Sequence, residues 1–163
     1  MGLDMYFYLN RYDSRSKWDD EKLANDGEVS QVQYPKALKS LEDYIYDRNF
    51  MSVESKYQVG YFRKFNALHA YIVDNFANGV DECQEIEIDE TDLQKMLNDL
   101  VQVDNDHSKA EELLPTRSGF FFGGTEYDDW YFSDVKDAIK MIKLIMEVKA
   151  NNKEYYLSYR ASW

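Results

Sequence analysis

Two polar side chains that stand one helical turn apart offer the clearest chance for chemistry in this sequence. An amide at Asn66 and an imidazole at His69 can reach the same neighbour if the segment is helical. Together they supply donors and acceptors that suit a base edge or a phosphate. Two interpretations are open for the pair. It either faces a ligand, or it is a satisfied, half-buried pair that ties a helix to a sheet.

A glycine-rich aromatic stretch, residues 113–132, is the second candidate. It holds three of the seven glycines. Gly123 and Gly124 permit a close approach of the backbone to a strand or a ligand. No lysine follows these glycines, so the stretch is not a phosphate-binding loop. An aromatic core cluster with a tight turn is the alternative interpretation. The residues that we expect to contact a ligand are Arg63, Asn66, His69, Arg117, Gly119, Phe122, Gly123, Gly124, Tyr127, Trp130 and Arg160.

Metal and nucleophile patterns are weak. Residues 104–106 resemble the start of a calcium loop, but Lys109 stands where glycine is needed and Pro115 where glutamate is needed. The two histidines and Cys83 have no paired spacing for zinc. Acidic neighbours argue against an activated Cys83 thiol. We therefore expect no metal, no cofactor and no catalytic residue.

The elements that must position these residues follow from apolar periodicity and from helix-capping signals. They predict an α+β fold in which a small, mainly antiparallel sheet, including the N- and C-terminal strands, is packed by about four helices. Residues 1–163 form a single domain, and 13–33 form a long flexible loop. The predicted strands are 3–10, 57–60 (a strand or a turn), 85–89 and 154–162. The predicted helices are 35–49, 61–76, 89–101, 107–114 and 133–150, with Asp89 or Thr91 and Ser133 as caps.

Composition limits the class of protein. A chain of 163 residues suits one domain with a real core. No apolar run approaches the roughly 20 residues of a membrane span, and the first residues lack the features of a signal peptide. The single cysteine excludes an internal disulfide and suits a reducing compartment. We therefore expect a cytoplasmic protein that does not bind membranes, and the sequence is compatible with a homo-oligomer.

Negative charge is concentrated in one segment of the chain. The formal net charge is −12, and residues 74–112 carry thirteen acids against Lys95 and Lys109. Direct binding of nucleic acid is disfavoured there because phosphate contacts need lysine and arginine. The segment is either a solvated, solubilising face or a surface for a basic partner.

Four sequence blocks resemble a family of small proteins encoded mainly by bacteriophages and prophages. The blocks are MGLDMYFY, VGYFRKFNALHAYIVDN with the following GVDEC, ELLPTRSGFFFGGTEYDDWY, and YYLSYRASW. The resemblance covers most of the chain outside 13–55. Tryptophan is common in the family where Phe62 stands, and serine where Ala161 stands. The resemblance implies an accessory phage protein that acts in the host cytoplasm.

Three functions follow from these patterns. The first is non-enzymatic binding of a small anionic or nucleotide-like ligand, which in a phage setting could sequester a host-defence signal. The second is inhibition of a basic host protein by the acidic segment acting as a nucleic-acid mimic. The third is a small hydrolase that uses His69 as its general base. Ligand binding at the expected residues and hydrolysis both require that His69 and the glycine turn line one cavity. If they do not, these residues have a purely structural role.

Overall fold

The computed structural model describes residues 2–15, 35–46 and 51–163. The chain divides into two compact units, Met1–Leu9 with Tyr57–Trp163, and Asn10–Lys56. The strands are β1 (Asp4–Arg15), β2 (Met51–Arg63), β3 (Ile86–Ile88) and β4 (Tyr155–Ser162). The helices are α2 (Lys39–Tyr46), α3 (Asn66–Phe76), α4 (Glu90–Asn105), α5 (Ala110–Leu113) and α6 (Asp129–Asn151), and short 3-10 turns occupy Lys36–Leu38 and His107–Lys109.

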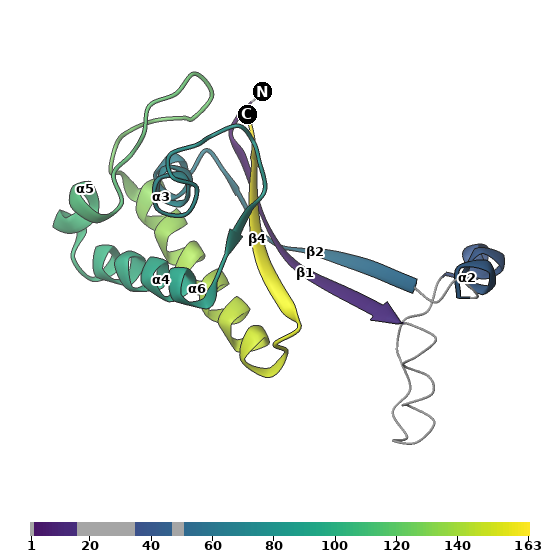
Figure 1. Cartoon of the computed structure of the whole chain (residues 1–163). Helices are drawn as coiled ribbons and strands as arrows, with labels where there is room; N and C mark the ends of the chain where they lie inside the picture. Colours follow the sequence, from purple (N-terminus) through teal and green to yellow (C-terminus); the bar gives the residue numbers. More distant parts are fainter. Residues whose placement is uncertain (1, 16–34, 47–50) are drawn as a thin grey trace. The chain divides into compact units, whose positions relative to one another are not determined.

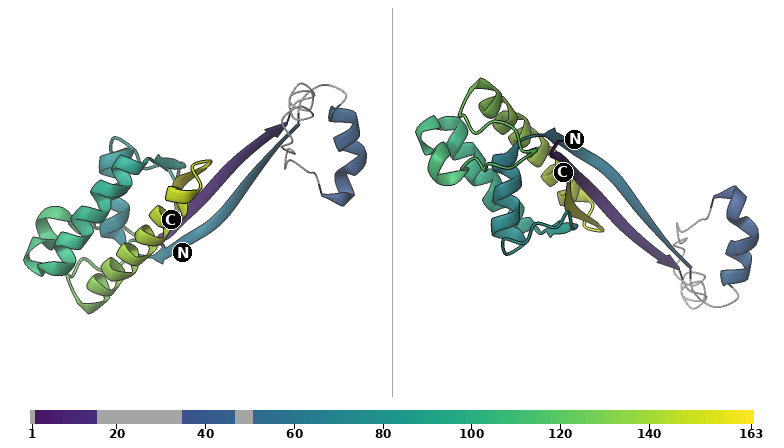
Figure 2. Two further views of the ribbon diagram at one scale, coloured as in Figure 1. Left: turned by 90° about the horizontal axis from the view of Figure 1, so that it is seen from below. Right: turned by 90° about the horizontal axis from the view of Figure 1, so that it is seen from above.

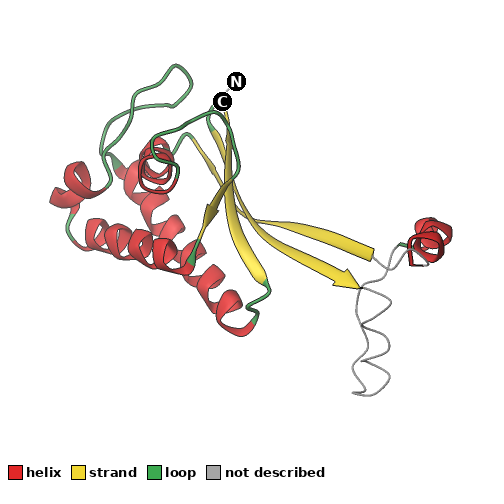
Figure 3. Ribbon diagram, in the orientation of Figure 1, coloured by secondary structure: helices red, strands yellow, loops and turns green. Residues whose placement is uncertain are grey.

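The sheet is antiparallel, with the strand order β2-β1-β4-β3 (Figures 1 and 3). The N-terminal strand β1 lies beside the C-terminal strand β4, which confirms the predicted α+β fold. The short strand β3 lies at the edge, as its alternating acids predict, and pairs Ile86 with Tyr159 and Ile88 with Leu157. Both isoleucines are buried while Glu87 faces solvent.

Helices α3, α4 and α6 gather on one side of β3 and β4 (Figures 1 and 2). Apolar side chains that the sequence places every third or fourth residue meet the alternating apolar residues of the strands there. The core is continuous and includes fully buried residues from each of these elements. They include Leu3, Met5, Phe7, Leu68, Ile72, Leu93, Met96, Leu100, Val135, Ile142 and Leu157.

Three predicted boundaries at the edges of the candidate site are wrong. The strand predicted for 57–60 continues to Arg63, so the helix predicted to begin at Tyr61 begins at Asn66. The reason is that burial alternates from one residue to the next at the end of the strand, where Tyr61 is exposed and Phe62 is buried. This strand pattern overlaps the helical spacing of apolar residues in the sequence. Helix α6 begins at Asp129 rather than Ser133, because the Asp128 carboxylate caps it by accepting from the Tyr131 N–H.

Residues 13–15 of the predicted long loop belong to β1, which extends to Arg15. Residues 16–33 of that predicted loop lie outside the described residues, as does the predicted helix end at Asn49. Helix α2 forms after Pro35 as predicted. Leu38 of the preceding 3-10 turn, and Leu41 and Tyr44 of α2, are exposed.

The three consecutive phenylalanines lie in a turn, and the strand considered for them does not form. Phe120 is 94% exposed whereas Phe122 is 9% exposed. The Leu3 N–H donates to the Phe121 carbonyl at 3.1 Å, which ties the turn to the start of the sheet.

Residues 74–112 fold as the end of α3, β3, α4 and the short helical turns that follow. Many of their carboxylates, such as Glu87, Glu90 and Glu111, are exposed. This exposure fits both a solubilising face and a surface for a basic partner, so it does not distinguish the two interpretations. Within the described ranges, no helix has both the length and the apolar character needed to cross a membrane.

Candidate functional site

A sharp reversal joins β2 to α3 and places three polar residues together. Lys64 has a positive φ of 63°, which is uncommon for a residue with a side chain. Its N–H donates to the Leu3 carbonyl at 2.8 Å, and its carbonyl accepts from the Asn66 N–H at 2.8 Å. The reversal therefore brings Arg63, Lys64 and Asn66 to the start of α3.

Asn66 holds the aromatic loop in place. Its side chain is buried, at 3% exposed. The Asn66 amide donates to the carbonyls of Phe122 at 3.0 Å and Gly124 at 2.7 Å, and its Oδ1 accepts from the Arg117 N–H at 2.9 Å. A buried amide must satisfy its donors and acceptors, and the loop backbone does so here. Asn66 is therefore a clamp on residues 117–124.

Two glycines let the loop lie close to its neighbours. Gly123 has a φ of +90°, and a Cβ added there would lie 3.0 Å from the Lys64 Cβ. A Cβ added at Gly119 would lie 2.6 Å from the Phe122 ring. Any side chain at these positions would displace the loop from the Lys64 stem or from the Phe122 ring. The glycine turn is thus one wall of a site, as a close backbone approach predicts.

A cavity of about 350 Å³ lies where the reversal, the loop and the first turns of α6 meet. Backbone and side chains of all three segments line it. The lining residues are Arg63, Lys64, Phe65, Asn66, Thr116, Gly123, Gly124, Glu126, Asp128, Trp130, Tyr131 and Asp134. We call it the Lys64 cavity.

The Lys64 cavity combines both signs of charge with an accessible aromatic ring. Arg63 and Lys64 are the basic residues of its lining, and the carboxylates come from Glu126, Asp128 and Asp134. The Arg63 guanidinium also lies 3.8 Å from the Asp4 carboxylate, which is outside the lining. Trp130 is 81% exposed, so its indole is available for stacking. The arrangement can bind a ligand that has an anionic group, a ring and hydrogen-bond donors.

Asp134 is the unusual acid of this cavity. Burial, and then the nearby charges of Asp137 and Asp128, raise the pKa of its carboxyl to about 6. Titratable groups with displaced pKa values concentrate at functional sites, although structural clusters also displace them. The raised pKa is therefore consistent with a site at this cavity.

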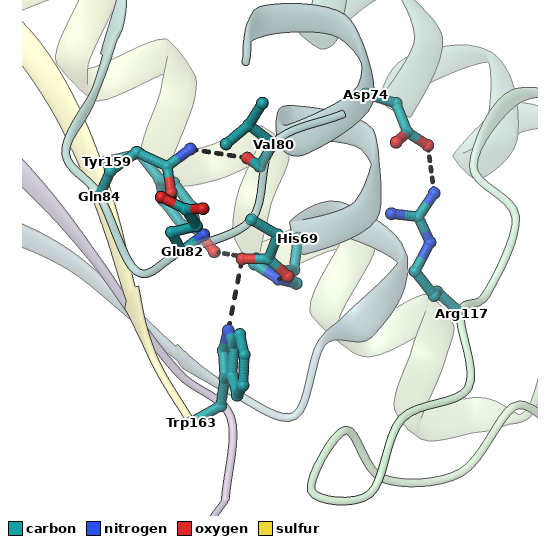
Figure 4. Close-up of polar contacts among 9 residues, drawn as sticks. His69, Asp74, Val80, Glu82, Gln84, Arg117, Tyr159 and Trp163 are labelled. Carbon is teal, nitrogen blue, oxygen red and sulfur yellow. Dashed lines mark hydrogen bonds and ion pairs between the residues drawn. The ribbon is translucent and has the colours of Figure 1, made fainter. Parts of the chain in front are cut away.

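His69 lies in a different region, near Tyr159 and Trp163 (Figure 4). Its side chain is 1% exposed; Nδ1 lies 2.7 Å from the Tyr159 hydroxyl and Nε2 lies 3.0 Å from Asp81 Oδ2. The Trp163 indole donates to the other Asp81 oxygen at 3.3 Å. We call these four residues the His69 cluster. Both ring nitrogens are occupied, so His69 is not placed to accept a proton from a bound substrate.

The Phe122 ring packs against the His69 cluster, and burial shifts the pKa of its tyrosine. The Phe122 ring meets the imidazole edge-on, with ring centroids 5.2 Å apart. Burial, and then the charges of Asp81 and Cys83, raise the pKa of the Tyr159 hydroxyl well above its ordinary value. Tyr159 is thus a neutral partner of the imidazole at neutral pH.

The structure brings together only part of the predicted site. Five of the expected residues line the Lys64 cavity: Arg63, Asn66, Gly123, Gly124 and Trp130. The expected residues outside its lining are His69, Arg117, Gly119, Phe122, Tyr127 and Arg160. His69 and the glycine turn therefore do not line one cavity, and His69 makes the contacts expected of a buried, satisfied residue. Sequence reasoning missed Lys64, Glu126, Asp128 and Asp134, although the first adjoins Arg63 and the others flank the tryptophan of the aromatic stretch.

The expected residues outside the cavity make structural contacts. Arg117 forms an ion pair with Asp74 of α3 (Figure 4). Arg160 donates from Nε to the Cys83 carbonyl at 3.1 Å. The Tyr127 hydroxyl accepts from the Thr116 N–H at 3.3 Å, and its ring meets Tyr131 edge-on.

The segment that resembles the start of a calcium loop has a capping role in the structure. Asp106 caps the 3-10 turn that follows α4, because its Oδ1 accepts from the Ser108 N–H at 3.1 Å. Across the residues that the structure describes, no three His, Cys, Asp or Glu side chains are grouped to hold a metal ion.

Comparison of the chain with protein-family models, with curated proteins and with solved structures found no match in any of the three.

Proposed function

We propose that this chain is a non-enzymatic binding protein that captures a small anionic, ring-bearing ligand of the nucleotide type in the Lys64 cavity. One observation carries the proposal: two cations, Arg63 and Lys64, and an exposed indole, Trp130, line the same cavity. Cations bind phosphate, and an indole face stacks on any base.

The dimensions of the cavity support this ligand class. A volume of about 350 Å³ lies at the lower end of the range for small-molecule sites. A mononucleotide or a cyclic mononucleotide suits such a volume better than a dinucleotide cofactor. The absence of a phosphate-binding loop in the sequence agrees with recognition by side chains instead of a glycine-rich cradle.

The enclosure of His69 favours binding over hydrolysis. A general base must come within hydrogen-bond reach of the proton that it removes. His69 is buried, and its nitrogens are occupied by Tyr159 and Asp81. In the phage setting that the sequence resemblance implies, capture without turnover would lower the concentration of a host nucleotide signal.

Isothermal titration calorimetry with linear and cyclic mononucleotides tests the proposal. We expect at least one nucleotide to bind. The single variant Trp130→Ala, and the double variant Arg63→Ala/Lys64→Ala, should each weaken that binding by about tenfold or more. Phe120→Ala and Lys136→Ala are matched controls, since both side chains are exposed and neither lines the cavity. Wild-type protein that binds none of these nucleotides would contradict the proposal.

A further inference from the structure

The Lys64 cavity places a stacking ring and a carboxylate side by side on one helix. Trp130 and Asp134 stand four residues apart on α6, and both line the cavity. Residues at this spacing are neighbours on a helix surface, with Cβ atoms about 5–6 Å apart. A base stacked on the Trp130 indole would therefore present an edge toward the Asp134 carboxylate.

The three carboxylates of this cavity differ in their contacts with protein groups and in their burial. Asp128 caps α6 and accepts from the Tyr131 N–H at 3.0 Å. Glu126 is exposed, and its Oε2 lies over Gly124, 2.5 Å from where a Cβ would stand. Asp134 is half-buried on the same helix face as the indole. It is the acid best placed to accept hydrogen bonds from the edge of a stacked base.

An ionised carboxylate accepts hydrogen bonds through two oxygens and donates none. It therefore matches an edge with two adjacent N–H donors, the bidentate arrangement that gives strong, directional binding. Guanine presents such a pair, N1–H and the N2 amino group, on its Watson–Crick edge. Adenine presents an acceptor at N1 beside its amino group, so one carboxylate oxygen would face a lone pair.

We propose that Asp134 is a specificity-determining residue that selects a guanine-type base edge, so that the ligand is a guanine mononucleotide or its cyclic form. This inference rests on the proposed function and deepens it by naming the base. Arg63 and Lys64 would then hold the phosphate while Trp130 stacks on the purine.

The charged groups around Asp134 add a dependence on pH. From α6 it is faced by Asp128 and Asp137, from the loop by Glu126, and from the β2–α3 reversal by Arg63 and Lys64. Burial, and then the charges of Asp137 and Asp128, raise the pKa of Asp134 to about 6. The carboxylate is thus ionised above that pH and ready to accept from guanine, and it becomes neutral below it. The preference for guanine should consequently fall on acidification.

Calorimetric titration of the full chain with GMP, IMP and AMP tests the inference. IMP retains N1–H and lacks the amino group, so it separates the two hydrogen bonds. Wild-type protein should bind GMP about tenfold or more tightly than AMP, with IMP between them. Asp134→Asn should reduce this ratio to about twofold or less, because an amide offers one acceptor and one donor in place of two acceptors. Glu147→Gln is the matched control, because Glu147 is an exposed acid farther along α6 and does not line the cavity.

The outcomes separate the two proposals. Equal affinities for GMP and AMP in the wild type, or a preference that Asp134→Asn retains, would overturn the role of Asp134 and leave the binding function standing. Binding of none of the three would overturn both. If the variant does not fold, the wild-type ratio of affinities at about pH 7.5 and about pH 5 decides, because the inference requires it to fall. A ratio that stays constant contradicts the inference.

Discussion

One helix serves two polar regions that differ in accessibility. Asn66 and His69 stand on α3 one turn apart, yet Asn66 borders the Lys64 cavity whereas His69 lies inside a closed cluster. In both cases protein groups occupy the side-chain donors and acceptors. The comparison shows that the Asn66 and His69 side chains hold neighbouring protein groups in place. Residues from the neighbouring segments are the ones available to contact a ligand.

The largest expected effect concerns the closed region. His69→Ala removes the partner of the Tyr159 hydroxyl and one partner of Asp81, and it leaves a buried void. We expect a loss of about 3 kcal/mol or more in the free energy of unfolding. Urea denaturation measures this loss, and nucleotide affinity of the folded variant should be unchanged. His107→Ala, at the other and exposed histidine, should cost about 1 kcal/mol or less. Equal losses would show that the His69 cluster does not stabilise the fold.

Asn66→Ala should give the next largest effect. It leaves the carbonyls of Phe122 and Gly124 and the N–H of Arg117 without their partner. We expect a loss of about 2–4 kcal/mol in urea denaturation. Unlike His69→Ala, it should also weaken nucleotide binding, because the loop forms a wall of the cavity. Asn75→Ala, at an exposed position of the same helix, is the control and should change neither quantity by much. Unaltered binding by Asn66→Ala would contradict the clamp.

Gly123→Ala and Gly79→Ala form a matched pair. Both glycines have positive φ, but an added Cβ meets the Lys64 stem at Gly123 and nothing within 4 Å at Gly79. The backbone penalty of about 1–2 kcal/mol should therefore be common to both. Gly123→Ala should cost about 1 kcal/mol more, because the loop must move away from Lys64. Thermal or urea unfolding measures the difference, and equal costs would show that the loop does not pack on Lys64.

The smallest expected effect is the contribution of Asp134 to stability. Folding raises its pKa from the ordinary 3.8 to about 6, so the folded state holds a proton that the unfolded state has lost between these values. Stability contributed by this group therefore falls as pH rises through that window. Asp134→Asn should stabilise the protein at neutral pH, by about 1 kcal/mol or less because solvent screens a half-exposed carboxyl. The gain should vanish near pH 3.8. Denaturation at several pH values measures it, and a gain that does not depend on pH would contradict the assignment.

Sequence patterns predict much of the fold because they depend on local periodicity and capping. The edge strand Ile86–Ile88 shows its alternating burial directly in the sequence. The start of α3 is not predictable in this way, because the residues from Tyr61 to Phe65 fit both a strand and a helix. The resulting reversal at Lys64, with its positive φ, depends on a hydrogen bond to Leu3 from a distant part of the chain.

The candidate site is predictable only in part for a related reason. Residue types identify Asn66 and the glycine turn as interesting, but a sequence does not say whether a polar group is satisfied by the protein or left for a ligand. His69 and Asp81 are twelve positions apart, and Tyr159 lies ninety positions from His69. Their meeting depends on the order of strands in the sheet. The acids near Trp130 can be seen in the sequence. Whether they can contact a ligand depends on a cavity that forms only when the chain folds.

The most direct test of the comparison uses the tryptophan side chains in one experiment. Trp130 lines the Lys64 cavity, whereas the Trp163 indole is bonded to Asp81 in the His69 cluster. A titration with GMP, followed by NMR of the indole N–H resonances assigned with Trp→Phe variants, reports on both regions at once. We predict that the Trp130 resonance shifts with saturation and that the Trp163 resonance stays in place. A shift at Trp163 with Trp130 unchanged would contradict the assignment of the ligand site.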